Sequence, residues 1–237
     1  PSSANGRRHR LETGFTGDIM TACRLGQPYH RMYLAAFLLD FSVAVSFTAM
    51  PFFIIERLGG GAALSGTVGA VQMAVYAFGC LASAGFVSRA SNSLYWAVGG
   101  VGGFALLFLL VPRVRTSGLC AAAASAPFLG LALAWPAMQA WLGQEPDVKT
   151  RACRIAAFNT ATAFGFTLSP LVTGPLYDAD FRLPFALLAA LCIAVTGLIL
   201  SLIPKTPGSR HKPVEEQPAD ETGSVLIAPG LLYASWA

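Results

Sequence analysis

The ionisable residues of this chain are confined to short stretches that separate six long apolar segments. The segments cover residues 33–55, 64–87, 94–111, 119–142, 155–177 and 183–203. Each is 18 to 24 residues long and, Asp40 apart, contains no Asp, Glu, Lys, Arg or His. A helix needs about 20 apolar residues to cross the hydrocarbon core of a bilayer, and there its backbone must satisfy its own hydrogen bonds. The pattern predicts an all-α membrane protein, a bundle of six transmembrane helices.

The composition agrees with a membrane protein and offers no metal or cofactor site. Charged residues make up 12% of the chain, against roughly 25% in soluble domains. Cys80, Cys120 and Cys192 fall inside apolar segments and contribute to no CxxC pair. We expect these cysteines to be small buried apolar residues rather than disulfides or metal ligands.

The loops and their charges predict the orientation. Short loops make neighbouring helices antiparallel. Four basic residues lie on one side of the predicted membrane, namely Arg57, Arg113, Arg115 and Arg182. The other twelve Lys and Arg residues lie on the opposite side. The excess of basic residues marks the cytoplasmic side, so both ends of the chain are expected there, in a multi-pass protein of the plasma membrane.

The flanking segments are predicted to lie outside the bundle. Residues 1–32 form a polar, basic tail that begins with Pro1, which suggests a fragment. Residues 204–224 are a hydrophilic, Pro-interrupted linker. Residues 225–237 are apolar again but too short to span a bilayer. We interpret them as the truncated start of a seventh helix, with an amphipathic tail as the alternative.

Polar residues recur at helical spacing in the first, second, fourth and fifth segments. A polar stripe within hydrocarbon must face protein or water. We therefore expect these four helices to surround a wet pathway, with direct helix-to-helix hydrogen bonding as the alternative. Besides Asp40, the candidate pathway residues are Gln72, Tyr76, Trp135, Gln139, Asn159, Thr162 and Phe166.

The third and sixth segments have no Asn, Gln or Asp and are expected to face lipid. The third carries a GxxxG pair, Gly99 and Gly103, and the sixth repeats alanine at 186, 190 and 194. Small residues at this interval let helix backbones approach closely.

Asp40 is the single ionisable residue within the six segments. It lies roughly 10 Å from the predicted cytoplasmic end of its helix, at 1.5 Å per residue. An ionised carboxylate there costs about 2.5–3.5 kcal/mol on insertion scales. Such a residue suits proton transfer or substrate contact. The alternative is a structural partner in the cytoplasmic loops, or solvent reaching it from the boundary.

Two local patterns resemble motifs of the major facilitator superfamily. The first is Gly85-Phe86-Val87-Ser88-Arg89, where family members usually have Gly-x-Leu-small-Asp-Arg-x-Gly-Arg-Lys. The glycine and the small residue match, but the Asp and the closing Gly-Arg-Lys are missing, which puts the usual gate latch in doubt. The second lies in the fifth segment and runs from Gly165 to Gly174. It resembles the antiporter pattern Gly-x-x-x-Gly-Pro-x-x-x-Gly, with Ser169 in place of the middle glycine before Pro170.

The resemblance implies the N-terminal half of a twelve-helix transporter whose second half completes the pathway. It implies a secondary active transporter that moves a small solute by alternating access. The second motif favours export, and together with Asp40 it suggests proton-coupled efflux. The expected partners are lipid, a solute, protons and the second half of the same protein. The alternative is another six-helix carrier, or a membrane scaffold or receptor that transports nothing.

Enzymatic and nucleotide-driven functions find no support in the residues. The three histidines, His9, His30 and His211, lie outside the segments, so they cannot ligate haem within the bundle or act there as catalytic bases. The chain also lacks a GxSxG motif and a P-loop. We expect no enzyme, no cofactor, no metal site and no nucleic-acid partner.

Overall fold

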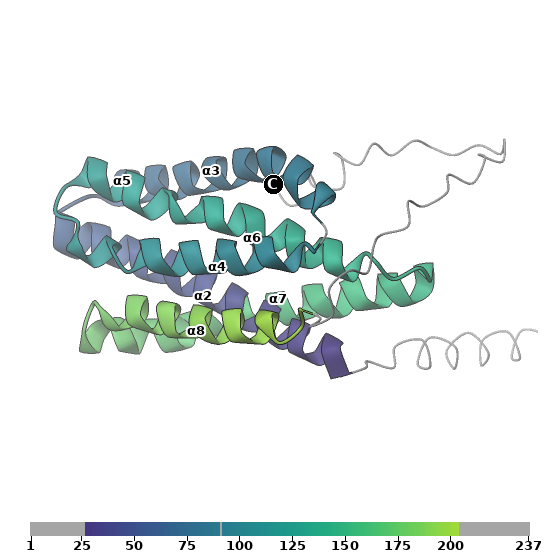
Figure 1. Ribbon diagram of the computed structural model, residues 1–237. Coiled ribbons are helices and arrows are strands. Elements are labelled where there is room, and N and C mark those ends of the chain that lie inside the picture. Colours follow the sequence, from purple (N-terminus) through teal and green to yellow (C-terminus); the bar gives the residue numbers. More distant parts are fainter. Residues whose placement is uncertain (1–26, 91, 204–237) are drawn as a thin grey trace, which may run out of the picture. The chain divides into compact units, whose positions relative to one another are not determined.

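A computed structural model of the chain describes residues 27–90 and 92–203, and this part is helical. Figure 1 shows the helices running side by side. Their bounds are α2 (Gln27–Leu58), α3 (Ala62–Arg89), α4 (Leu94–Phe108), the 3₁₀ turn η1 (Val111–Arg113), α5 (Ser117–Ser125), α6 (Pro127–Leu142), α7 (Val148–Ala179) and α8 (Leu183–Leu200). Six stretches of the described residues are long and apolar enough to cross a membrane. The predicted six-helix fold is confirmed.

The helices pack in the spatial order α3, α6, α4, α8, α2, α7, so the chain order is rearranged in space. The two helices at the ends of this series, α3 and α7, each make their main contacts with one neighbour. The buried shares of their most apolar stretches are 22% in α3 and 17% in α7, the lowest of the six. One side of each end helix is therefore left without a neighbour among the described residues.

The fourth segment is interrupted, and proline explains the interruption. Pro127 has no N–H to continue the backbone ladder, and it begins α6 directly after α5 ends. The Gln72 side chain, from α3, donates a hydrogen bond to the Ala124 carbonyl oxygen at 3.1 Å. A polar side chain of one helix thus bonds the backbone of another at the break.

α7 begins seven residues before the predicted segment because Asp147 caps it. The Asp147 carboxylate accepts hydrogen bonds from the backbone N–H of Thr150 at 2.8 Å and from the Thr150 hydroxyl. Bonding to Thr150 lowers the pKa of the Asp147 carboxyl from its usual value. A capping Asp satisfies N–H groups that a helix start leaves unbonded, so the polar residues from Val148 onward are helical.

Close backbone approach occurs at glycines other than the predicted pair. A Cβ added to Gly100 would lie 2.3 Å from the Gly130 carbonyl oxygen, and one added to Gly130 would lie 2.3 Å from that of Gly100. Nothing lies within 4 Å of a Cβ built on Gly99 or Gly103. The packing prediction for the GxxxG pair was wrong, because α6 meets the adjacent face of α4.

The alanine repeat of the sixth segment also points away from the bundle. The residues at 186, 190 and 194 are all exposed on α8. The face of α8 that packs carries Phe185, Leu188, Cys192 and Val195 instead. Cys120 is buried as predicted, and so is Cys192, whereas Cys80 is half-buried. Of the predicted tail at 1–32, residues 27–32 belong to α2, which begins six residues before the predicted segment. Residues 1–26, the predicted linker at 204–224 and the predicted partial helix at 225–237 lie outside the described residues.

Candidate transport pathway

One face of α2 carries side chains that reach both α6 and α7. Tyr29, Asp40 and Phe47 are spaced by eleven and seven residues, which places them on the same face of a helix. The first and last of them contact both neighbouring helices. Asp40, between them in the sequence, is therefore directed toward the junction of α2, α6 and α7.

An ionic and aromatic cluster closes this junction at the end of the bundle where α2 and α7 begin. The Arg154 guanidinium donates hydrogen bonds to the Glu145 carboxylate and the Tyr29 hydroxyl. It also lies 3.7 Å from the centre of the Tyr29 ring, and that ring is 5.3 Å from the ring of Trp141. The side chains of Arg154 and Glu145 are 14% and 19% exposed, so this ion pair is largely shielded from solvent. We call these four residues the Arg154 cluster.

A purely aromatic layer closes the same junction further along α2. The ring of Phe47 lies 5.5 Å from that of Phe128 on α6 and 6.3 Å from that of Phe166 on α7. Phe128 is fully buried and also meets Phe104 and Phe108 of α4. This aromatic layer lies about 10 Å beyond Asp40 along the α2 axis, and the Arg154 cluster lies about 16 Å in the other direction.

Asp40 is half-buried between these two layers. α7 packs closely at its level, since a Cβ on Gly165 would lie 2.3 Å from the Phe37 carbonyl oxygen and 3.0 Å from the Phe41 backbone nitrogen. Among the described residues none donates a hydrogen bond to the Asp40 carboxylate or forms an ion pair with it. The predicted alternative of a structural partner finds no such partner in this part of the chain.

Trp135 lies on α6 between the same two layers as Asp40 on α2. Phe47 meets Phe128, and α2 and α6 run in opposite directions. Seven residues back from Phe47 is Asp40, and seven residues on from Phe128 is Trp135. Seven residues are two helical turns, so both pairs share their faces. The half-buried Trp135 ring makes an edge contact, at 5.6 Å, with the buried Phe158 ring of α7.

The candidates on α3 mostly take part in helix packing. Gln72 is 1% exposed and bonds the backbone of α5, as described above. Ser83, on the same stripe, donates a hydrogen bond to the Ala132 carbonyl oxygen at 2.7 Å. Tyr76 is half-buried against the apolar core. For Gln72 and Ser83 the structure shows the alternative that the sequence left open, hydrogen bonding between helices, and contact of Gln72 with a solute stays a prediction.

The remaining pathway candidates, three on α7 and one on α6, differ in how exposed they are. Thr162 is half-buried, one turn before Gly165, and its hydroxyl donates to the Asn159 carbonyl oxygen at 2.8 Å. Asn159 is half-buried, and Phe166 is 47% exposed although its ring meets Phe47. Gln139 is exposed near the end of α6, away from the Asp40 level.

The two motif regions have different surroundings. In α7, Gly165 and Ser169 are buried against α2, and the hydroxyls of Ser169 and Thr173 lie 3.3 Å apart. The helix continues through Pro170, which is exposed, and through Gly174, which has open space around it. In α3, the segment Gly85, Ser88 and Arg89 forms the last turn, and both Gly85 and Arg89 are exposed.

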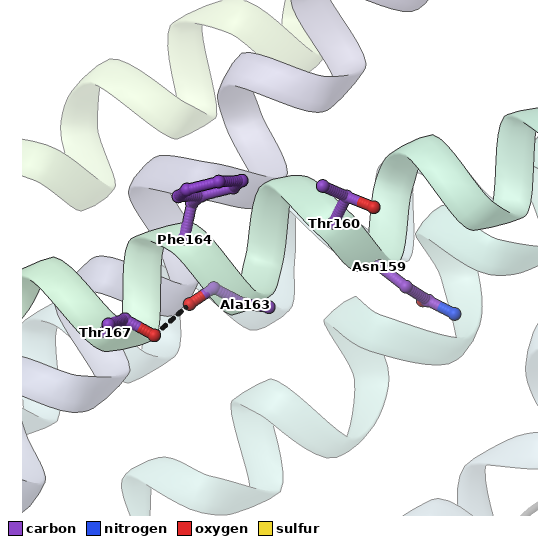
Figure 2. Close-up of a pocket in the computed structure, with 5 residues that line it drawn as sticks. All are labelled: Asn159, Thr160, Ala163, Phe164 and Thr167. Atoms are coloured by element: carbon purple, nitrogen blue, oxygen red, sulfur yellow. Dashed lines mark hydrogen bonds between the residues drawn. The ribbon is translucent and has the colours of Figure 1, made fainter.

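A recess with a volume of about 430 Å³ lies on α7, and all five of its lining residues come from this one helix. They are Asn159, Thr160, Ala163, Phe164 and Thr167, shown in Figure 2. The Thr167 hydroxyl is bonded to the Ala163 carbonyl oxygen at 2.8 Å. Of these five residues, Asn159 is the one that was predicted from the sequence to line the pathway. The others lie on the face of α7 turned away from α2, which helical spacing alone could not mark as a recess.

Comparisons with known proteins agree with this fold. No curated protein matches the chain. A solved structure described as a crystal structure of the peptide transporter POT (E310Q mutant) in complex with sulfate is similar, with a TM-score of 0.66 and 15% sequence identity. The alignment covers 73% of this chain and 37% of the transporter chain. Residues 32–236 match the family model described as Major Facilitator Superfamily. With six membrane-spanning helices and this match over most of its length, the chain belongs to the Major Facilitator Superfamily.

Proposed function

We propose that the protein is a secondary active transporter that moves a small solute by alternating access and exchanges it for protons at Asp40. The observation that carries this proposal is the position of the Asp40 carboxylate. Between Met32 and Phe47 it is the one Asp, Glu, Lys, Arg or His side chain of α2. It faces the junction with α6 and α7 and has no partner among the described residues. A carboxylate placed within a span without a partner is costly, and such residues mark ion or substrate pathways.

The neighbours of Asp40 leave its charge uncompensated. The facing residues between the two layers are Trp135 on α6 and Thr162 and Gly165 on α7, none of which is charged. α8 contributes no acidic or basic side chain between Leu183 and Leu200. The nearest charged groups on this face are those of the Arg154 cluster, about three turns away along α2. Protonation from an aqueous side is therefore the simplest way to neutralise this carboxyl group.

The unpaired sides of the end helices support a pathway shared with further protein. Most residues in the apolar stretches of α3 and α7 are not buried. All the described residues that line the recess on α7 come from α7 itself. The chain spans 37% of the length of the transporter that it resembles. We propose that the second half of the protein covers these faces, in a plasma membrane, with the end carrying the Arg154 cluster on the cytoplasmic side. Whole-protein transport depends on that second half.

The experiment is a flux measurement on the full-length protein in proteoliposomes with an imposed pH gradient. The probes are radiolabelled glucose, alanylalanine, citrate and tetraphenylphosphonium, which represent four chemical classes of solute. We expect one of them to accumulate with the gradient in the native protein. Asp40→Asn should abolish the gradient-driven part, because an amide cannot take up and release a proton.

Asp178→Asn is the matched control, because Asp178 is an exposed carboxylate near the C-terminal end of α7, whereas the Arg154 cluster lies near the start of that helix. It should leave pH-driven flux unchanged. Equal pH-driven flux in Asp40→Asn and the native protein would contradict the proposed proton role. No flux of any probe in well-folded protein would contradict transport of these solute classes.

A further inference from the structure

We propose that the junction around Asp40 binds a monovalent organic cation with an aromatic or apolar body. This inference rests on the proposed function and names the substrate class of the same site. Three properties of the junction support it: its negative charge, its aromatic rings and its few oxygen ligands.

The charge of the junction is negative and uncompensated. Asp40 has no cationic partner among the described residues, and the facing turns of α6, α7 and α8 carry no basic side chain. A carboxylate in a low-dielectric setting favours a cation strongly, since charges interact more strongly there than in water. An anionic solute would be repelled, and a neutral solute would leave the carboxylate unpaired.

The aromatic rings around Asp40 suit an organic cation. The half-buried rings of Phe37 and Phe41 lie 6.2 Å apart on the turns next to Asp40. Trp135 lies on α6 between the same two layers as Asp40, with part of its surface exposed and its position fixed by the edge contact with Phe158. Cations are attracted to aromatic faces, and Trp gives the strongest attraction. The aromatic layer at Phe47 adds further apolar surface for the body of the ligand.

A small metal cation fits this junction poorly. Hard cations such as Ca²⁺ take six to eight oxygen ligands. The described part of the chain contains no group of three His, Cys, Asp or Glu side chains that could hold a metal ion. The Thr162 hydroxyl, on the facing part of α7, is already bonded to a backbone carbonyl. A diffuse charge on an organic group does not require such a set of ligands.

Equilibrium binding of radiolabelled tetraphenylphosphonium to the full-length protein in lipid nanodiscs tests the inference. This probe carries a permanent charge, so its own protonation cannot change. Triphenylphosphine oxide, which is aromatic and neutral, serves as the competitor of similar size. We expect saturable binding that the neutral compound does not displace. Asp40→Asn should weaken binding at least tenfold, and Asp40→Glu should retain most of it.

Two aromatic variants and a folding check keep the test decisive. Trp135→Phe should keep most of the affinity and Trp135→Leu should lower it several-fold, because only the former keeps a π face. Asp178→Asn should bind like the native protein. Each variant is used only if it elutes as a single symmetric peak and melts within a few degrees of the native protein. If Asp40→Asn fails this check, Asp40→Glu and the Trp135 pair decide the outcome.

The outcomes separate this inference from the proposed function. Equal binding by native protein and Asp40→Asn would overturn the cation site. Absence of tetraphenylphosphonium binding, together with gradient-driven flux of glucose, alanylalanine or citrate, would overturn the cation site while transport stands. Asp40-dependent binding without flux of any probe would support the site and contradict transport.

Discussion

α2 and α7 have the same length and very different surroundings. Each contains 32 residues. The most apolar stretch of α2 is 56% buried, and that of α7 is 17% buried. α2 packs on both α7 and α8, whereas α7 packs mainly on α2. A central helix and an edge helix can therefore carry equally long apolar segments, and apolar length does not report how much of a helix meets protein.

The two faces of α7 also differ in burial. One face carries Phe158, Gly165, Ser169, Thr173 and Tyr177, all buried. The opposite face carries the recess residues, most of them exposed. Substitutions on the buried face of α7 should therefore affect assembly of the bundle, and substitutions on its recess face should leave the fold intact. The following variants test it, ordered by the size of the expected effect on stability.

Gly165→Ala should be the most damaging of these changes. Its Cβ would lie 2.3 Å from a backbone oxygen of α2, which cannot move aside as a flexible side chain can. We expect a loss of about 3 kcal/mol, or failure to assemble. Gly174→Ala on the same helix meets nothing within 4 Å, so the preference of helices for Ala should make it neutral or slightly stabilising. Thermal melting in detergent measures both, and equal melting temperatures would refute a close α2–α7 contact.

Glu145→Gln should have the next largest effect, because it leaves the shielded Arg154 guanidinium without its anionic partner. Breaking a buried ion pair destabilises by about 3–5 kcal/mol, and the residual exposure of this pair should reduce that to about 2 kcal/mol. A double-mutant cycle with Arg154→Gln isolates the coupling free energy. Additive effects on the melting temperature would mean that the pair does not hold the α6–α7 loop against α7. Arg115→Gln, an exposed residue, is the control.

Ser83→Ala tests whether the other edge helix is attached in the same way. The Ser83 hydroxyl links α3 to the Ala132 carbonyl oxygen of α6. Losing this hydrogen bond should destabilise by about 1 kcal/mol. Thr67 bonds only the Ala63 carbonyl of its own helix, so Thr67→Ala should change stability by less than about 0.5 kcal/mol. Chemical denaturation in detergent compares the two, and a larger effect at Thr67 would reverse our assignment of the α3 faces.

Phe164→Ala should have the smallest effect on the fold. The side chain is 60% exposed on the recess face of α7, and apolar contact with lipid gives no hydrophobic gain over contact with another apolar group. We expect a stability change within about 0.5 kcal/mol. We also expect a lower flux of the transported probe in proteoliposomes. A destabilisation comparable to that of Gly165→Ala would show that this face is packed rather than open.

Most of the fold followed from the spacing of charged residues, and less of the site did. Six uninterrupted apolar segments predicted six helices, because a bilayer tolerates few other arrangements. Asp40 stood out for the same reason. The break at Pro127 and the early start of α7 at Asp147 were missed, although both depend on local signals, a proline and a capping residue. The predicted segments were bounded by charged residues, and that criterion takes no account of prolines or capping residues.

What the sequence by itself determined is which faces of each helix are polar, small or apolar, since that depends only on the helical repeat. It could not determine which neighbour each face meets. Gly100 rather than Gly99 packs on α6, and Gln72 bonds the backbone of α5, because the spatial order of the helices differs from their order in the chain. Only the tertiary structure placed Asp40 and Trp135 between the same two layers of contacts that join α2 to α6. Contacts between residues far apart in sequence depend on helix packing, which no local pattern specifies.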